Sequence, residues 1–402
     1  MKLSIKVQLK LTPEQEKLLY ETASATRFAY NWAKVYSDDY YQKHNKTINE
    51  SDLRKEFTKL KKDPNYNWLN NIPNDATKQA IRNYCKARND YFKGKAKKPR
   101  FKRKKDFKDS FYNDVQKIEI TETKVRLSVI GWVDLCEHGR LPNYKFSSSK
   151  GKIIIGNPIY NPTISYNGQY WFLSIAIETN IIEQELIKDK RIGIDLGLKD
   201  FATVCIKEKK NNKIIYSYKK YKSKKKEFKK LMKKKKKLDR KISKRNEEYK
   251  KIMKGGKSIT KSKNYFKLLK KRRKLSTKIT NVQKNYIYKI VSSLVKAKPE
   301  CIIIEDLNVK GMMKNKYLSK WVSFNMFHEF KRILEYKCIL YGIPLIITDR
   351  FYPSTQTCSR CNHKLEKEQK LKLSDRKFIC PICGYIKDRD ENAAKNLCNY
   401  IV

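Results

Sequence analysis

The sequence predicts a protein of mixed class, in which a helical block, an all-β block and an α/β block follow one another. Three observations lead to this prediction. Residues 10–95 have helical periodicity, and residues 110–179 alternate short apolar runs with Gly, Pro and Asn turns. From residue 191 onward, the pattern becomes strand, helix and strand. The 402 residues are enough for two or three domains with real cores.

The N-terminal region begins with a strand, because "LSIKVQLKL" alternates apolar and polar residues. Thr12 is a candidate N-cap and Pro13 suits the first turn of a helix. Helical patterning then covers residues 16–44, 50–60 and 74–94, and a basic linker, "KGKAKKPRFKRKKD", follows. The short alternating runs after this linker favour a small antiparallel β-barrel or sandwich.

The C-terminal half begins with "RIGIDLGLKDFATVCIKE", which predicts a buried strand, a glycine bend and a second strand. Thirteen of the nineteen residues at 219–237 are lysine, and two long helical stretches flank Gly255 and Gly256. We interpret this region as a solvated helical hairpin with one apolar seam. The later stretch "ECIIIEDL", a helix and a strand after Pro344 form a βαβ pattern.

The charge of the chain favours a polyanionic partner. Lys and Arg number 94 against 41 Asp and Glu, which gives a formal net charge of +53. Nucleic acid fits this excess best, because each neutralised phosphate releases a counterion; an anionic membrane surface is the alternative. No apolar run approaches the ~20 residues of a membrane span, and the N-terminus has no signal-peptide pattern. We therefore expect a cytoplasmic, nucleoid-associated protein of a prokaryote, without a membrane partner.

Two cysteine pairs predict a zinc site. Cys358 and Cys361 are separated by two residues, as are Cys380 and Cys383. Four thiolates at this spacing are typical of a zinc ribbon, in which one zinc ion is structural because no coordination position stays open. His363 is a weaker competing ligand. The knuckle turns require positive φ, which Gly384 supplies after the second pair and Asn362 can adopt after the first.

Three acidic residues lie in or beside apolar segments. They are Asp195 in "RIGIDLGL", Glu305 at the end of "CIIIEDL" and Asp390 before "ENAAKNL". Three carboxylates brought together would repel one another unless a divalent cation lies among them, and magnesium accepts such ligands. Each acid also has an ordinary explanation: an ion pair with lysine for Asp195, solvent exposure for Glu305 and helix capping for Asp390. Four further acids lie in the same neighbourhoods, and we interpret them as decoys rather than ligands: Asp200, Asp306, Asp349 and Asp388.

Four segments in this order resemble the TnpB family of transposon-encoded RNA-guided nucleases, which are relatives of compact type V CRISPR effectors. They are "GIDLGLKDFAT", "IIIEDLNVKGM", "FYPSTQTCSRC" and "CPICGYIKDRDENAAKN", and "FKGKAKKPRFK" adds a further likeness. The resemblance covers essentially the whole chain and is most specific over residues 191–396. Two departures concern local packing: the first knuckle lacks a glycine, and Tyr288 stands where a histidine is common.

The resemblance implies a domain arrangement and a catalytic site. The nuclease domain would be RuvC-like, with an RNase H fold and an inserted zinc ribbon, and would use Asp195, Glu305 and Asp390 to bind two Mg²⁺ ions. The helix after Asp390 would dock on the sheet through one face, made by Ala393, Ala394, Leu397, Cys398 and Ile401. The implied parts are a wedge-like β-barrel (1–10 and 96–182), a helical recognition lobe (11–95), the nuclease domain (186–354 and 386–402, with a lysine-rich hairpin at 222–298) and the zinc ribbon (355–385).

The implied function is RNA-guided DNA endonuclease activity next to a short adjacent motif, with guide RNA and target DNA as partners. On a polar helical stretch, four residues could read base edges, although an ordinary solvated face would look the same: Lys78, Gln79, Arg82 and Asn83. The alternatives are a compact type V CRISPR effector, a nuclease-inactive RNA-guided regulator and a DNA transposase. The sequence leaves the oligomeric state open.

Overall fold

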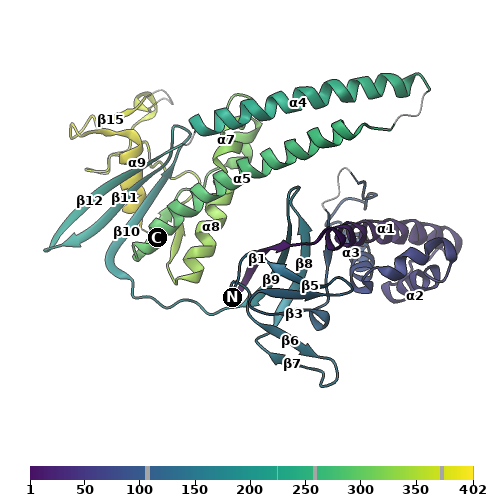
Figure 1. Ribbon diagram of the computed structural model, residues 1–402. Helices are drawn as coiled ribbons and strands as arrows, with labels where there is room; N and C mark the ends of the chain where they lie inside the picture. The colour runs from purple at the N-terminus through teal and green to yellow at the C-terminus, as the bar shows by residue number, and fades with distance from the viewer. Residues whose placement is uncertain (105–108, 224, 257–259, 372–374, 402) are drawn as a thin grey trace. The chain divides into compact units, whose positions relative to one another are not determined.

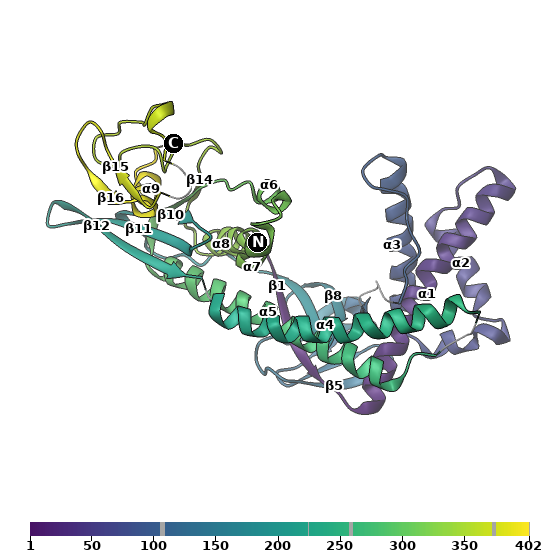
Figure 2. The ribbon, with the colours of Figure 1, turned by 90° about the horizontal axis from the view of Figure 1, so that it is seen from above.

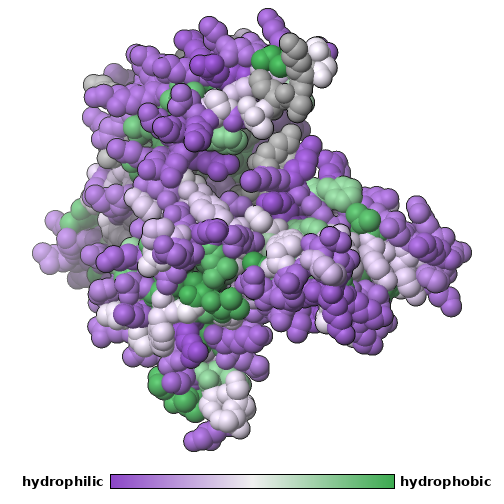
Figure 3. All heavy atoms as spheres, turned by 45° about the vertical axis from the view of Figure 1, so that its right-hand side comes forward, coloured by the Kyte–Doolittle hydropathy of each residue, from purple (hydrophilic) through white to green (hydrophobic). Residues whose placement is uncertain are grey.

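The computed structural model describes residues 1–104, 109–223, 225–256, 260–371 and 375–401. The chain divides into two compact units, Met1–Thr179 and Asn180–Val402, each with its own hydrophobic core. The surface seen in Figure 3 is mainly hydrophilic, with small apolar patches. Of the helices in the described ranges, none has the length and apolar character needed to cross a membrane.

Strands of the first unit form an antiparallel sheet in the order β2-β8-β9-β1-β5-β4-β3-β6-β7 (Figure 1). Strand β1 joins its two parts, because Lys2–Gln8 pair with β9 whereas Leu9 and Lys10 pair with β5. Over the described residues, the end strands β2 and β7 do not pair with each other. The bounds are β1 (Lys2–Lys10), β2 (Ser110–Tyr112), β3 (Glu119–Ile120), β4 (Lys124–Leu127), β5 (Gly131–Leu135), β6 (Tyr144–Ser147), β7 (Lys152–Ile155), β8 (Ile159–Tyr166) and β9 (Trp171–Glu178), with a 3₁₀ turn at Val115–Lys117.

Helices lie between β1 and β2, in the segments where the sequence has helical patterning. This helical lobe consists of α1 (Pro13–His44), α2 (Glu50–Leu60), a 3₁₀ segment (Pro64–Asn71) and α3 (Asn74–Phe92). The predicted cap is confirmed: the Thr12 hydroxyl accepts a hydrogen bond from Gln15 N, and the Gln15 side chain accepts one from Thr12 N. Aromatic and aliphatic side chains of the three helices form the core of the lobe, including Tyr30, Phe57 and Tyr84.

The second unit contains a mixed sheet in the order β12-β11-β10-β13-β14. Its strands are β10 (Ile187–Leu196), β11 (Asp200–Lys210), β12 (Lys213–Lys222), β13 (Pro299–Ile304) and β14 (Leu345–Ile347). β12, β11 and β10 are antiparallel neighbours, whereas β10, β13 and β14 run parallel. The parallel pair β13 and β14 is joined through helices, which confirms the predicted βαβ unit.

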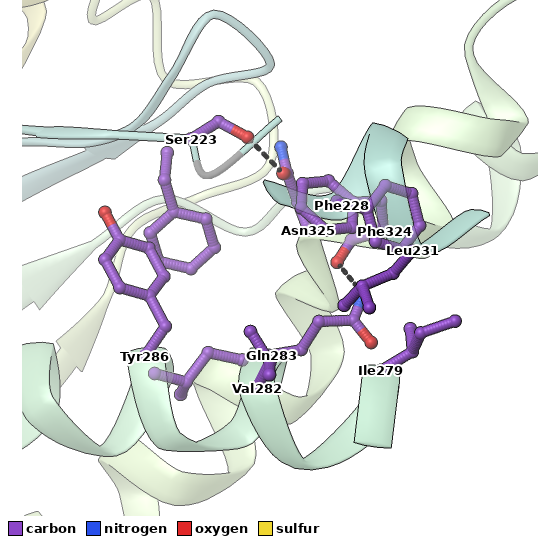
Figure 4. A pocket seen from close by; sticks show the side chains of 11 residues that line it. Ser223, Phe228, Leu231, Ile279, Val282, Gln283, Tyr286, Phe324 and Asn325 are labelled. Carbon is purple, nitrogen blue, oxygen red and sulfur yellow. Dashed lines mark hydrogen bonds between the residues drawn. The ribbon is translucent and has the colours of Figure 1, made fainter. Parts of the chain in front are cut away.

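Of the helices between β12 and β14 in the chain, the first two form the predicted lysine-rich hairpin, and the second and the last cover one face of the sheet. In chain order, these helices are α4 (Lys225–Lys254), α5 (Lys263–Lys296), α6 (Val309–Lys314), α7 (Ser319–Asn325) and α8 (Phe327–Leu340). Ile192 and Ile194 of β10 share a core with side chains of α5 and α8. Figure 2 shows these two helices next to the sheet. At the base of the hairpin, Phe228, Ile279 and Phe324 pack together (Figure 4). The space left there is about 20 Å³, room for one water molecule.

The opposite face of the sheet carries α9 (Arg389–Cys398), which follows a two-stranded ribbon made by β15 (Lys377–Ile379) and β16 (Ile386–Asp388); a 3₁₀ turn at Lys367–Gln369 precedes them. Four of the five residues expected on the docking face are fully buried: Ala393, Ala394, Leu397 and Cys398. The expectation for Ile401 is wrong. It is 84% exposed, because α9 ends at Cys398 and the next residues leave the helical face.

Gly193 of β10 lies directly beneath α9, and we predict that Gly193→Ala destabilises the second unit. An added Cβ would collide with Ala394 O and Cys398 N and would lie 2.8 Å from Cys398 Cα. These are backbone atoms, so the helix must shift, at a cost of about 1–3 kcal/mol in the free energy of unfolding. Chemical denaturation measures this loss. Gly255→Ala is the matched control, because its Cβ would meet nothing closer than 3.5 Å; equal stability of the two variants would contradict the prediction.

Candidate functional site

Asp195 and Glu305 lie at the same end of two neighbouring parallel strands. Asp195 is in β10, and Glu305 directly follows β13; the register pairs Ile194 with Ile304, so the two acids come next to each other. The Glu305 carboxylate accepts a hydrogen bond from Leu196 N at 3.2 Å. The parallel pairing thus places two carboxylates at one edge of the sheet.

Asp390 reaches the same edge from α9. Side chains two residues apart on a strand share a face, so Asp195 points to the face on which Gly193 meets α9. Asp390 is in the first turn of that helix, and both Nε and Nη2 of Arg389 lie 3.3 Å from its Oδ1. It does not cap the helix, so the capping explanation considered from the sequence is wrong.

Burial and mutual repulsion act on the two strand acids. Burial raises the pKa of Asp195 well above its ordinary value, and the charges of Glu305 and Asp390 raise it further. Burial also raises the pKa of Glu305 to about 7; the Leu196 N–H opposes this, whereas Asp390 adds to it. Within the described part of the chain, neither Asp195 nor Glu305 forms an ion pair with a basic side chain. The lysine partner considered for Asp195 is therefore not found there.

The nearby acids have other partners. Asp306 forms ion pairs with Arg350 at 2.7 Å and Lys331 at 3.3 Å, and the Arg350 contact contributes most to lowering its pKa. Asp388 is the N-cap of α9, because its Oδ1 accepts hydrogen bonds from the N–H groups of Asp390 and Glu391. Asp306 and Asp388 therefore have partners in the structure, and so does Asp390, which pairs with Arg389 at 3.3 Å.

Lys220 is a residue that sequence analysis missed. It bridges the start of α9, with Nζ 3.0 Å from Asp388 Oδ2 and 3.1 Å from Glu391 Oε1. The register aligns Asp195, Thr203 and Lys220 in one row across β10, β11 and β12, so their side chains share a face. Lys220 therefore ties the first turn of α9, and with it Asp390, to the outer strand. Its position within a lysine-rich segment hid this role.

The four predicted cysteines come together. Their sulfur atoms all lie within 4.8 Å of one another, with Cys358 and Cys383 at 3.7 Å and Cys361 and Cys380 at 3.6 Å. A tetrahedron of Zn–S bonds of ~2.3 Å has edges of about 3.8 Å, so the cluster fits zinc. Over the described residues it is the only group of three or more ligating side chains this close. Gly384 (φ +64°) and Asn362 (φ +60°) adopt the predicted left-handed conformation.

Two buried asparagines join α9 to the segment that carries the first cysteine pair. Asn392 Oδ1 accepts a hydrogen bond from Ser359 N at 3.0 Å, and its Nδ2 donates to Thr357 O at 2.7 Å. One turn later, Asn396 Nδ2 donates to the carbonyls of Ser354 and Thr357. Sequence analysis missed this role, although two asparagines four residues apart on an apolar helical face were the available signal.

The structure separates the four residues considered for base reading. Gln79 and Asn83 line a groove of about 440 Å³ between α1, α3, β2 and β8, and Gln79 Nε2 donates to Asn83 Oδ1 at 3.0 Å. Arg82 instead pairs with Glu50 at 3.2 Å, and Lys78 is exposed outside the groove lining. Of the four candidates, only Gln79 and Asn83 therefore line this groove.

The raised pKa of Glu305 predicts that the stability of the metal-free protein depends on pH. This raised pKa means that the folded state holds a proton that the unfolded state loses near pH 4.5. This stabilisation is complete below pH 4.5 and is lost as pH rises to about 7. We expect the unfolding free energy of wild type relative to Glu305→Gln to fall by about 3 kcal/mol across this window. Urea denaturation at several pH values measures the difference; a constant difference would contradict the prediction.

The cysteine cluster predicts one zinc ion per chain, bound through sulfur alone. Cys361→Ser with Cys383→Ser should lose the metal and lower the melting temperature, because the ribbon core is built around the cluster. Elemental analysis and X-ray absorption would measure metal content and ligation. Cys136→Ser is the control, since this exposed cysteine lies outside the cluster. Wild-type protein that contains no zinc would refute the assignment.

Three family models match successive parts of the chain. Residues 1–46 match a model described as "Helix-turn-helix domain", residues 174–316 match "Probable transposase" of the OrfB IS605 type, and residues 327–397 match "Cas12f1-like, TNB domain". In this structure, residues 1–46 form strand β1 and the single helix α1. The last model spans the four cysteines and Asp390.

Curated relatives match over nearly the full length. A "Putative RNA-guided DNA endonuclease" of Streptomyces pristinaespiralis is 25% identical, with 99% of this chain and 89% of the relative covered. InsQ of Escherichia coli (strain K12), with the same description, is 24% identical, covering 98% and 91%. A "TnpB-like protein" of Acanthamoeba polyphaga mimivirus is 27% identical over 63% of this chain and 45% of the relative.

Two solved structures align along most of the chain. One is a Cas12f1–sgRNA–target DNA complex, with 15% identity, a TM-score of 0.33 and 99% of each chain covered. The other is the mini-RNA-guided endonuclease CRISPR-Cas_phi3, with 12% identity, a TM-score of 0.42 and coverage of 98% and 91%. The evidence for family membership is the succession of the three sequence models, together with relatives aligned from end to end. The chain belongs to the TnpB family, the OrfB proteins of IS605-type elements.

Proposed function

We propose that this chain is an RNA-guided DNA endonuclease of an IS605-type transposon. The observation that carries the proposal is that Asp195, Glu305 and Asp390, from a strand, a strand end and a helix start, lie close enough for the charges of Glu305 and Asp390 to raise the pKa of Asp195. Two of these acids are held in a setting that raises their pKa, without a basic partner in the described part of the chain. Uncompensated carboxylates are costly for folding, so their presence favours a functional explanation.

The donor set fits divalent magnesium. Carboxylate oxygens are the ligands that magnesium prefers, and a cation would offset the repulsion that raises the pKa values of Asp195 and Glu305. We assign Asp195, Glu305 and Asp390 as the protein ligands of two magnesium ions. Bound there, the ions would stabilise charge on the attacking and leaving oxygens of a phosphodiester. The reaction is hydrolysis, in which water attacks phosphorus and the bond to the 3′ oxygen breaks.

The chain's own residues position these carboxylates. Strand β10 orients Asp195, and the Leu196 N–H holds one oxygen of Glu305. Arg389 contacts Asp390 while Lys220 and the Asp388 cap hold the first turn of α9. Three antiparallel strands followed by two parallel ones is the sheet order of the RNase H fold, which supports the RuvC-like assignment.

Nucleic-acid binding is the second half of the proposal. The net charge of +53 favours phosphate contacts, and helix α4 presents exposed lysines along most of its length. The names of the relatives support a guide RNA and a DNA target for this chain too. A protein can hold a guide–target duplex by its shape and backbone, while base pairing supplies the choice of sequence. We propose that the first unit contributes to this nucleic-acid binding. Gln79 and Asn83 would then face base edges of the short duplex motif that adjoins the target.

Substitution of the three acids tests the proposal. We expect Asp195→Ala, Glu305→Ala and Asp390→Ala each to lower cleavage about a thousandfold or more, because ligands of one metal cluster act as a unit. Nucleic-acid binding should persist. Asp388→Ala should be milder, since it removes a helix cap, a loss of ~1 kcal/mol in stability. The assay is cleavage of a linear duplex with magnesium and the RNA that co-purifies with the protein.

Asp306→Ala is the matched control for Glu305→Ala. It adjoins Glu305 in sequence, but its carboxylate pairs with Arg350 and Lys331, so cleavage should remain near the wild-type rate. Full cleavage by Asp195→Ala or Glu305→Ala would overturn the mechanism. Full cleavage by Asp390→Ala, with none by Asp388→Ala, would show that Asp388 is the third acid instead.

A further inference from the structure

A second groove of the helical lobe has the properties of a ligand site. It lies between α1, α3 and the segment after α3, and its volume is about 390 Å³, within the ~300–1,000 Å³ typical of small-molecule pockets. It is distinct from the groove of Gln79 and Asn83 and shares no lining residue with it. Its wall includes aromatic and basic side chains, namely Tyr41, Arg88, Tyr91, Phe92 and Lys98.

Three aromatic side chains are exposed at this groove. Tyr41 is 51%, Tyr91 40% and Phe92 63% exposed, whereas Tyr84, which also lines the groove, is buried in the core of the lobe. They come from helix segments more than forty residues apart, so the fold gathers them. Aromatic faces left in water at one place are suited to stack on another flat ring.

The polar groups of the groove favour an anionic ligand with hydrogen-bond acceptors. Arg88 is held by a hydrogen bond from Nη2 to Ile48 O at 2.8 Å, yet its buried Nε has no partner among the described residues. Lys98 is exposed at the rim. The acidic lining residue Asp38 is already paired with Lys34 at 2.5 Å. Arg88, whose guanidinium also lies 5.9 Å from the centre of the Tyr84 ring, and Lys98 are cations of the groove that no acidic side chain pairs with in the described part of the chain.

The segment that carries Lys98 is anchored next to α1. Asn31 Nδ2 donates to Lys102 O at 3.0 Å, and Lys102 N donates to Asn31 Oδ1 at 2.8 Å. Lys34 Nζ also lies 5.0 Å from the centre of the Phe101 ring. These contacts hold the chain four residues after Lys98 beside the helix, so the rim lysine belongs to a defined wall.

We propose that this groove binds an unpaired nucleotide of a nucleic-acid strand. The base would stack on the exposed aromatic rings, and the phosphodiester would lie beside the half-buried Arg88 guanidinium and accept a hydrogen bond from the exposed Lys98. An unpaired base is required because a base inside a duplex has both faces covered by its neighbours. The inference rests on the proposed function only in taking nucleic acid as the partner.

The test separates stacking from charge. Fluorescently labelled six-nucleotide strands, one with bases and one abasic, carry the same phosphates and are titrated into the full-length protein without magnesium. We expect wild type to bind the base-containing strand about tenfold more tightly, since stacking on aromatics contributes ~1–3 kcal/mol per base. Tyr41→Ala and Tyr91→Ala should bring this ratio close to one. Lys98→Ala should weaken the binding of both strands equally. It should also reduce the slope of log affinity against log salt concentration by about one.

Two further variants keep the test decisive. Tyr91→Phe retains the ring and should keep the ratio, which excludes a general folding defect. Trp68→Ala removes a similarly exposed aromatic, 44% accessible, that lies outside the groove, and it should also keep the ratio. RNA and DNA versions of both strands distinguish the source of the nucleotide, and base discrimination with either one supports the site.

A wild-type ratio near one, or an unchanged ratio in the tyrosine variants, would overturn the inference. Guided cleavage measured on the same preparations keeps the two proposals apart. Guided cleavage together with an affinity ratio near one would refute only the nucleotide-binding groove. A tenfold ratio without any guided cleavage would retain the groove and refute the proposed endonuclease.

Discussion

Helix α9 can lie against the sheet because β10 has no side chain at Gly193, where the backbones of Ala394 and Cys398 fill the space. Much of the second unit depends on this contact. On one side, Cys205 and Cys398 share a buried cluster with Ala394. On the other, Asn392 and Asn396 bind the backbone before the first cysteines, so a single helix connects the sheet to the cysteine ribbon. The position of Asp390 therefore depends on both contacts of α9, with the sheet and with the cysteine ribbon.

The two proposed metal centres differ in how their ligands are arranged before a metal binds. The cysteine cluster is compact, with sulfur atoms at nearly the spacing that a tetrahedral ion requires. The acids are arranged under repulsion, which burial strengthens, and their pKa values rise as a consequence. A closed thiolate site suits a structural role, whereas carboxylates with unused coordinating capacity suit a reaction centre. The difference between them is a matter of ligand chemistry and of the charges nearby.

Much of the fold was predictable from local patterns. The cysteine spacing, the Thr12 cap, the lysine-rich hairpin and the apolar strands around Asp195 and Glu305 each depend on residues close in sequence. Contacts across long separations were not predictable. Lys220 acquires its role from strand register, Asn392 from a backbone more than thirty residues earlier, and the groove aromatics from the packing of α1 on α3. The prediction for Ile401 was wrong because helical periodicity does not show where a helix ends.

The two-way pairing of β1 has a consequence for the order in which the first unit folds. Lys2–Gln8 need β9, whose residues come more than 160 positions later, whereas Leu9 and Lys10 need β5. During synthesis at ~5–20 residues per second, the helical lobe can form from shorter-range contacts while β1 waits with free backbone groups. Until β9 emerges, that strand is an open edge to which another nascent chain could add. The lysines at positions 2, 6 and 10, spaced four residues apart, supply the like charges that discourage such pairing.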